Sequence, residues 1–226
     1  MSAPAAERWG AASGFAVIVV SAAAMVFERG AVLPADSADA VVAHYTGNRG
    51  AIFAQSMLFL AGAALYLWFL GSLRSFLLRA EGGTGRVSAI AFGAGVVWIG
   101  LSALAQAFQI GLAAAPAAAA LPALIATMNA VFTISALPLA VLLAAVAAVT
   151  WRHHAFPAWL GWVAVVAAGA QILLWSSTVV GSGPLAADGW LSYALYPVFL
   201  VWLVPATVVM TGRSRRSPGP DRERPE

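Results

Sequence analysis

The sequence predicts an all-α protein, a polytopic transmembrane bundle of about six helices with both termini in the cytoplasm. Three observations predict it. Of the 226 residues, 62% are hydrophobic and 9% are charged, whereas a soluble domain needs charged surface to stay dispersed. The charged residues stand in clusters between long uncharged runs. Arginine is distributed unequally among those clusters, which indicates a membrane topology.

Uncharged runs long enough to cross a bilayer define the helices. A helix needs roughly 20 apolar residues to span the hydrocarbon core. Between Arg86 and Arg152 lies an uncharged stretch of about 65 residues, which as one helix would be roughly 100 Å long and must fold back. The turn is predicted around Pro116 to Pro122, because proline removes a helical hydrogen bond and restricts the residue before it. The six predicted helices are 9–27, 50–73, 87–112, 123–151, 157–180 and 189–212.

Arginine predicts the orientation, because basic loops are retained on the cytoplasmic side. With the N-terminus inside, ten arginines fall in cytoplasmic segments and two fall outside, Arg29 and Arg49. The tail 213–226 is rich in arginine, proline and mixed charge and is predicted to be disordered in the cytoplasm. The pI near 10 is explained by this topology, so no nucleic-acid partner is expected.

The start of the chain admits a second interpretation. Residues 11–27 have the character of the apolar region of a cleaved signal peptide, with residues 38–40 as a small-residue cleavage site. The apolar run is long for such a peptide, and the cleavage site lies far beyond it. We therefore expect residues 9–27 to form a membrane helix.

The loop of residues 28–49 is the only sizeable polar segment predicted outside the membrane. Its pattern predicts a short amphipathic helix that lies across the outer ends of the bundle. Asp36 is expected to cap this helix and Gly47 to end it. A solvated connector is the alternative. The apolar face of the helix would comprise Val41, Val42 and Tyr45.

No ionisable residue falls within a predicted membrane core, which makes ion-coupled transport and intramembrane acid catalysis less favoured. Uncharged polar residues remain, and they fall in the outer half of the bundle. Gln106 and Gln109 share a helix face and are expected to point towards Asn129 across a hairpin. These amides either line an outward polar cavity or hold helices together by hydrogen bonds. The candidate ligand-binding residues are Gln55, Gln106, Gln109, Asn129 and Gln171.

The outer rim carries Glu28, His44 and Asp188, which are residue types that bind zinc. Their spacing is irregular, so solvated rim charges are the expected explanation and no metal is predicted. The chain has no cysteine, which removes thiolate nucleophiles and sulfur-ligated metals. The glycine-rich loop 81–86 lacks the preceding strand and the lysine of a phosphate loop and is expected to be a turn. No cofactor is predicted.

Several segments together resemble a known group of proteins. They are residues 43–45 (AHY), 48–50 (NRG), 67–74 (LWFLGSLR) and 81–86 (EGGTGR). The chain resembles an uncharacterised family of small bacterial six-helix integral membrane proteins, a domain of unknown function. This resemblance implies the architecture and brings no substrate, cofactor or catalytic residue. Because all twelve basic residues are arginine, the composition also favours a bacterial source, and the expected location is the bacterial plasma membrane.

Three functional classes remain open from the sequence. A non-enzymatic membrane component that binds a lipid, a small lipophilic ligand or a partner protein agrees best with the absence of embedded charge. A transporter or permease-like subunit would need an outward cavity lined by Gln106, Asn129 and Gln171. An integral membrane enzyme acting on a lipophilic substrate would need Glu28 and Asp188 to face one pocket. An enzyme is the less expected outcome.

Overall fold

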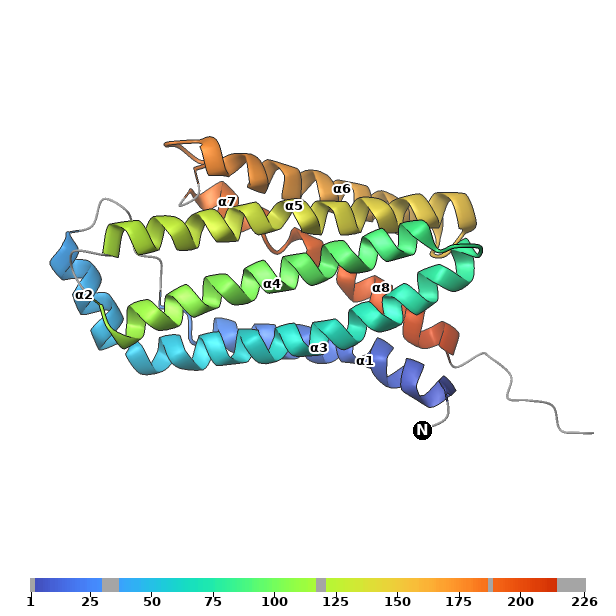
Figure 1. Ribbon diagram of the computed structural model, residues 1–226, viewed down its shortest axis with the longest axis horizontal. Coiled ribbons are helices and arrows are strands. Elements are labelled where there is room, and N and C mark those ends of the chain that lie inside the picture. Colours follow the sequence, from blue (N-terminus) through green and yellow to red (C-terminus); the bar gives the residue numbers. More distant parts are fainter. Residues whose placement is uncertain (1–2, 30–36, 117–120, 187–188, 215–226) are drawn as a thin grey trace, which may run out of the picture.

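The computed structural model describes residues 3–29, 37–116, 121–186 and 189–214, and all regular structure in these ranges is helical, as predicted (Figure 1). Of the tail predicted over residues 213–226, residues 213 and 214 are helical, and the rest lies outside the described residues. In chain order the elements are α1 (Ala3–Met25), α2 (Ala38–Gly47), α3 (Arg49–Glu81), α4 (Arg86–Ala114), α5 (Leu121–His153), α6 (Ala158–Ser176), the 3-10 helix η1 (Ser177–Val179), α7 (Trp190–Leu195) and α8 (Val198–Ser214).

The long helices form a closed ring. The helices α1, α3, α4, α5 and α6 each pack against the next long helix along the chain, and α8 packs against both α6 and α1. Neighbouring helices run in opposite directions along the bundle (Figure 1). The contact between α1 and α8 therefore joins the two ends of the chain and closes the ring.

The two ends of the bundle differ in character. The short helix α2 lies across one end, which we call the α2 end (Figure 1). The opposite end holds the α3–α4 and α5–α6 connections, the start of α1 and the end of α8. We call it the Arg-rich end, because Arg79, Arg86 and Arg152 lie at the helix termini there.

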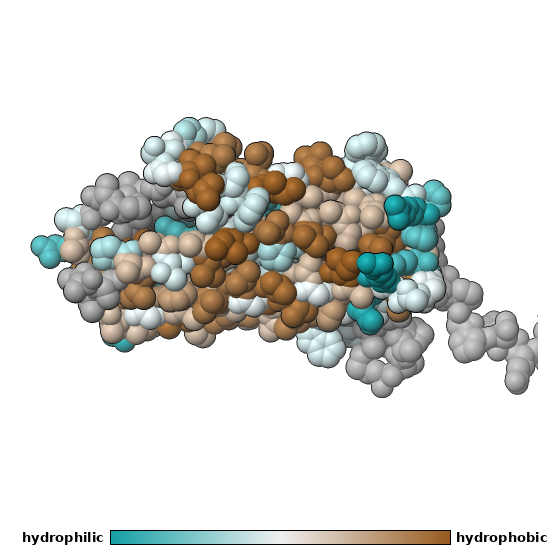
Figure 2. All heavy atoms as spheres, turned by 45° about the horizontal axis from the view of Figure 1, so that its top comes forward, coloured by the Kyte–Doolittle hydropathy of each residue, from teal (hydrophilic) through white to brown (hydrophobic). Residues whose placement is uncertain are grey.

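Five helical segments in the described ranges are long and apolar enough to cross a membrane. In α1, the apolar part Ala12–Met25 is shorter. On the face shown in Figure 2, hydrophobic side chains cover the middle of the bundle and hydrophilic ones gather at its two ends. This distribution is the one that a bilayer requires. The five segments are Arg49–Glu81, Arg86–Ala114, Leu121–His153, Ala158–Val179 and Trp190–Gly212.

Exposed tryptophans lie near both ends of the apolar belt. On α6, Trp159 is near the Arg-rich end and Trp175 is near the α2 end, and both are exposed. The helical rise puts them about 24 Å apart along the axis, somewhat less than the thickness of a hydrocarbon core of about 30 Å. Trp151 and Trp190, also exposed, belong to the helix ends at the same two levels. Such aromatic belts are typical of membrane–water interfaces.

The helix predicted over residues 189–212 is interrupted. α7 ends at Leu195, and α8 begins at Val198. Pro197 between them has no N–H, so it cannot donate to the carbonyl four residues earlier. Backbone carbonyls at the break therefore need another donor if they are to lie in a membrane.

α3 is longer than the predicted segment 50–73, because it continues to Glu81. Arg74 lies on this extension with its guanidinium over the aromatic ring of Phe92, 5.9 Å from the ring centroid. Long arginine side chains can stay in a helix while their charged groups reach the interface.

Glu81 joins the end of α3 to the start of α4. Its two carboxylate oxygens accept hydrogen bonds from the backbone N–H groups of Val87 and Ser88, each at 2.8 Å. A carboxylate in this position satisfies free donors at a helix N-terminus and faces the positive end of the helix dipole. The glycine-rich loop thus acts as a capped turn.

α1 packs against its neighbours through two glycines one turn apart. A Cβ atom at Gly14 would lie 2.5 Å from Thr207 Oγ1 on α8 and 2.9 Å from the Phe69 side chain on α3. A Cβ atom at Gly10 would collide with Ser72 of α3. Small residues four apart let helix backbones approach closely in membranes.

Aromatic side chains fill the centre of the bundle. Trp98 of α4 lies edge-on to Tyr66 of α3, with 5.0 Å between ring centroids, and to Phe199 of α8, with 5.2 Å. Phe199 in turn contacts Tyr196, whose ring lies 4.7 Å from that of Phe132 on α5. These contacts link four helices across the bundle, so side chains occupy its axis at this level.

The helix α2 is the predicted amphipathic helix, and it ends at Gly47 as expected. Its N-cap is Ser37, whose hydroxyl accepts a hydrogen bond from the N–H of Ala40 at 3.3 Å. The predicted cap Asp36 lies outside the described residues. Val42 is half-buried and packs against the same residues as Val41 and Tyr45, so all three contribute to the apolar face. This helix packs on the ends of α3, α4 and α5. We call the buried residues of this contact the α2 cluster: Val41, Tyr45, Ile52, Leu112, Ala113, Leu121 and Ile125.

Candidate functional site

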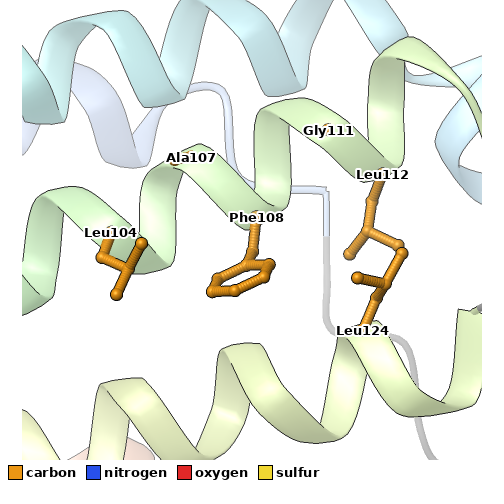
Figure 3. Close-up of a pocket in the computed structure, with 6 residues that line it drawn as sticks. All are labelled: Leu104, Ala107, Phe108, Gly111, Leu112 and Leu124. Carbon is orange, nitrogen blue, oxygen red and sulfur yellow. The ribbon is translucent and has the colours of Figure 1, made fainter.

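An apolar crevice of about 180 Å³ lies between α4 and α5 near the α2 end (Figure 3). The α4 side chains project from successive turns towards Leu124 of α5. All the lining residues are apolar, so the crevice can hold a ligand by shape and apolar contact but offers no acid, base or metal ligand. They are Leu104, Ala107, Phe108, Gly111, Leu112 and Leu124.

The crevice opens on the outside of the ring of helices. Leu104 is 46% exposed, and Ala107 and Gly111 are also exposed. At its other end, Leu112 belongs to the α2 cluster and Leu124 packs against that cluster. From Leu104 to Leu112 the helix rises about 12 Å, close to the roughly 15 Å depth of one leaflet of the hydrocarbon core.

Two of the predicted amides take part in a hydrogen-bond chain at the α2 end. Gln55 of α3 donates from Nε2 to Glu28 Oε2 at 2.6 Å. Gln109 of α4 donates from Nε2 to Gln55 Oε1 at 3.1 Å. Gln55 is 4% exposed, so this series of hydrogen bonds runs from the solvated rim into the interface between α3 and α4. Glu28 is thereby tied to α3, although it follows α1 in the sequence.

Gln106 and Asn129 take no part in the hydrogen bonds that link Gln109, Gln55 and Glu28. Gln109 turns towards α3, whereas it was expected to point towards Asn129 on α5. The backbone carbonyl of Asn129 accepts a hydrogen bond from the hydroxyl of Thr133 at 3.1 Å. Oε1 of Gln106 is buried and has no hydrogen-bond partner among the described residues. None of the five predicted amides lines the crevice between α4 and α5.

Gln171 of α6 occupies the break between α7 and α8. Its Nε2 lies 3.2 Å from the carbonyl oxygen of Leu195 and 3.4 Å from that of Tyr196, and it donates to both. These are the carbonyls next to Pro197, where regular helical bonding stops. Gln171 is fully buried, so its amide provides the donor that the interrupted backbone needs in an apolar environment.

The predicted rim residues do not form a metal site in the part of the chain that the structure describes. Within these ranges, no group of three or more His, Asp or Glu side chains lies close enough to hold a metal ion. Glu28 belongs to the amide chain, and the ring of His44 lies edge-on to that of Tyr45 at 5.4 Å. Asp188 lies outside the described residues. Burial and the nearby Tyr193 raise the pKa of Tyr45 above its ordinary value.

Sequence reasoning missed the crevice because it searched for polar groups. A signal was present: large apolar residues recur at positions 104, 108 and 112, with small residues at 107 and 111 beside them. On a helix these positions share one face, so the small residues leave a gap between large ones. Whether a neighbouring helix fills that gap cannot be read from one helix.

Comparisons with known proteins identify no relative of this chain. No protein-family model matches the chain, and neither a curated protein nor a solved structure matches it significantly. The resemblance drawn from the sequence motifs stays a prediction, and the function has to be inferred from the site itself.

Proposed function

We propose that this protein is a non-enzymatic component of the bacterial plasma membrane that binds a lipid chain in the crevice between α4 and α5. The crevice carries this proposal. It is lined only by apolar side chains, opens on the lipid-facing side of the bundle and extends over about the depth of one leaflet. Its volume of about 180 Å³ is below the roughly 300–1,000 Å³ typical of small-molecule sites, which favours one segment of an acyl chain.

The proposal includes six membrane crossings with both termini in the cytoplasm. α1 would be the first crossing, because its contacts follow α3 from one end to the other. Gly10 meets Ser72 near the Arg-rich end, and Glu28 meets Gln55 at the α2 end. The Arg-rich end would face the cytoplasm, where basic residues are retained.

Labelling with a photoactivatable phospholipid in membranes tests the lipid site. Ala107→Trp should fill the crevice and reduce crosslinking to α4 and α5 at least fivefold. Val97→Trp is the matched control, because Val97 is an exposed α4 residue that does not line the crevice and should leave crosslinking unchanged. Equal crosslinking in both variants would refute the lipid site. A fluorescent or alkaline-phosphatase fusion at the C-terminus tests the orientation, and only a cytoplasmic readout agrees with it.

A transporter or permease-like subunit is the second candidate. The observation that favours it is the break between α7 and α8, since interrupted helices are typical of transporter substrate sites. The aromatic side chains across the bundle axis favour the first candidate, because a transport path would have to displace them. Substrate uptake into vesicles that depends on Gln171 would support the second.

A further inference from the structure

The face of α4 that packs on α3 is distinct from the face that lines the crevice. Across this interface, Gln109 donates to Gln55 near the α2 end, and Trp98 lies against Tyr66 further towards the middle of the bundle. We call this interface the α3–α4 seam, and it is independent of the proposed lipid site. Two contacts place Gln55 and Tyr66 of α3 and Gln109 and Trp98 of α4 in the seam. From helical spacing we infer that Gln106, three residues from Gln109, and Ser56, buried beside Gln55, also belong to it.

Several polar atoms of the seam are buried without a hydrogen-bond partner among the described residues. They are Ser56 Oγ, Tyr66 Oη, Trp98 Nε1 and Gln106 Oε1. An unpaired buried polar atom destabilises the folded state, and native structures rarely leave several together. In a lipid-immersed bundle, bulk water cannot satisfy them from the sides.

Two contacts set the register of the seam. Gln55 lies against Gln109, and Tyr66 lies against Trp98. Tyr66 follows Gln55 by eleven residues on α3, and Trp98 precedes Gln109 by eleven residues on α4. This antiparallel register puts Gln106 opposite residue 58, so that Gln106 and Ser56 differ in height by about 3 Å. The unpaired carbonyl of Gln106 and the unpaired hydroxyl of Ser56 therefore belong to neighbouring levels, about 4.5 Å and 1.5 Å inside the Gln55–Gln109 hydrogen bond.

The chemistry of these atoms defines what can occupy the seam. The amide oxygen of Gln106 only accepts, so the occupant must donate a hydrogen bond. The hydroxyl of Ser56 donates or accepts. An acyl chain can do neither, whereas water does both and needs only two to four polar partners. At the α2 end, Glu28 and Gln55 connect this level to the solvated rim.

We propose that the α3–α4 seam holds water next to Ser56 and Gln106, and that this water exchanges with the medium at the α2 end past Glu28. The seam continues to Trp98, about 16 Å along α4 from Gln109, which is roughly the middle of the bilayer. The seam is thus a hydrated inlet that opens at the α2 end of the bundle.

The absence of cysteine makes the proposal directly testable. Gln106→Cys in proteoliposomes should react with a small water-soluble methanethiosulfonate at least tenfold faster than Leu104→Cys, because the reactive thiolate forms in water and not in lipid. Leu104 is the matched control, since it lies on the same helix at a similar depth but faces the crevice. Equal slow rates for the two variants would overturn the proposal.

Thermal unfolding of Gln106→Leu keeps the proposal testable if the cysteine variant does not fold. Loss of an amide that binds water should lower Tm by about 2–4 °C, the shift expected for one hydrogen-bonded group in a chain of this size. A rise in Tm would mean that the amide oxygen had been unpaired and would contradict the proposal. Ile110→Leu, on the next turn of α4, is the control for side-chain shape.

Discussion

Gly14 of α1 lies directly against Thr207 of α8, and this contact closes the ring of helices. A Cβ atom at position 14 would come within 2.5 Å of Thr207 Oγ1, closer than real Cβ contacts allow. The Thr207 hydroxyl is itself held by a 2.8 Å hydrogen bond to the carbonyl of Leu203. Closure therefore depends on the absence of a side chain at one position.

Gly14→Ala should destabilise the protein by about 1–3 kcal/mol, the usual cost of overpacking a tight contact. Gly100→Ala is the matched control, because Gly100 is exposed on α4 and a Cβ atom added there would meet nothing within 4 Å. The control should be neutral or slightly stabilising, since alanine favours helix more than glycine. Thermal unfolding in detergent measures both. Equal Tm values would show that α1 does not pack tightly on α8.

Gln171→Leu should lower stability by about 1–3 kcal/mol, because the carbonyls of Leu195 and Tyr196 would lose the donor between them. Gln171→Glu should lose less stability than Gln171→Leu, since a buried glutamate is protonated and keeps one donor. Hydrogen exchange of the α7–α8 segment, compared with the α3–α4 pair, measures the effect locally. Unchanged exchange at the break in Gln171→Leu would show that the amide does not hold it.

Glu81→Ala should destabilise the start of α4 by about 0.5–2 kcal/mol, the usual effect of removing a helix cap. The carboxylate satisfies the N–H groups of Val87 and Ser88, which alanine would leave to solvent. Glu81→Gln keeps one acceptor oxygen and should destabilise the start of α4 less than Glu81→Ala. Limited proteolysis at the glycine-rich loop measures the opening, and equal cleavage of the wild-type and alanine variants would contradict the capping role.

Tyr45→Ala should release α2 while leaving the bundle folded. Tyr45 is 4% exposed and anchors this short helix to the ends of α3, α4 and α5, and removing a large buried side chain costs about 3–5 kcal/mol. Thr46→Ala, on the exposed side of α2, is the matched control. Hydrogen exchange should rise in α2 alone. A parallel rise across the whole bundle would mean that α2 is part of the same cooperative unit.

Tyr45 should also titrate above the ordinary range of tyrosine, because burial and Tyr193 raise its pKa. Its ionisation opposes folding, so the contribution of neutral Tyr45 is present below the ordinary pKa near 10 and is lost as the pH rises beyond it. The difference in absorbance at alkaline pH between wild type and Tyr45→Phe isolates this group. A midpoint at or below 10 would contradict the burial of its hydroxyl.

Amino-acid composition along the chain is enough to predict six apolar segments, and five of these correspond to the helical segments that are long and apolar enough to cross a membrane. It also predicted α2 and its end at Gly47. These features depend on local composition and helical periodicity, which each segment carries alone. Composition does not predict the continuation of α3 to Glu81, because the charged residues Arg74 and Arg79 end the apolar run but not the helix.

The partner of each polar group depends on how the helices pack against one another. The sequence offered Asn129 as the partner of Gln109, but the structure pairs Gln109 with Gln55. It also pairs Gln171 with the carbonyls of Leu195 and Tyr196 at the break between α7 and α8, 24 and 25 residues away along the chain. In an apolar medium many pairings would satisfy an amide, so the choice depends on the order and rotation of helices around the ring. The same packing decides where α4 and α5 leave a crevice unfilled.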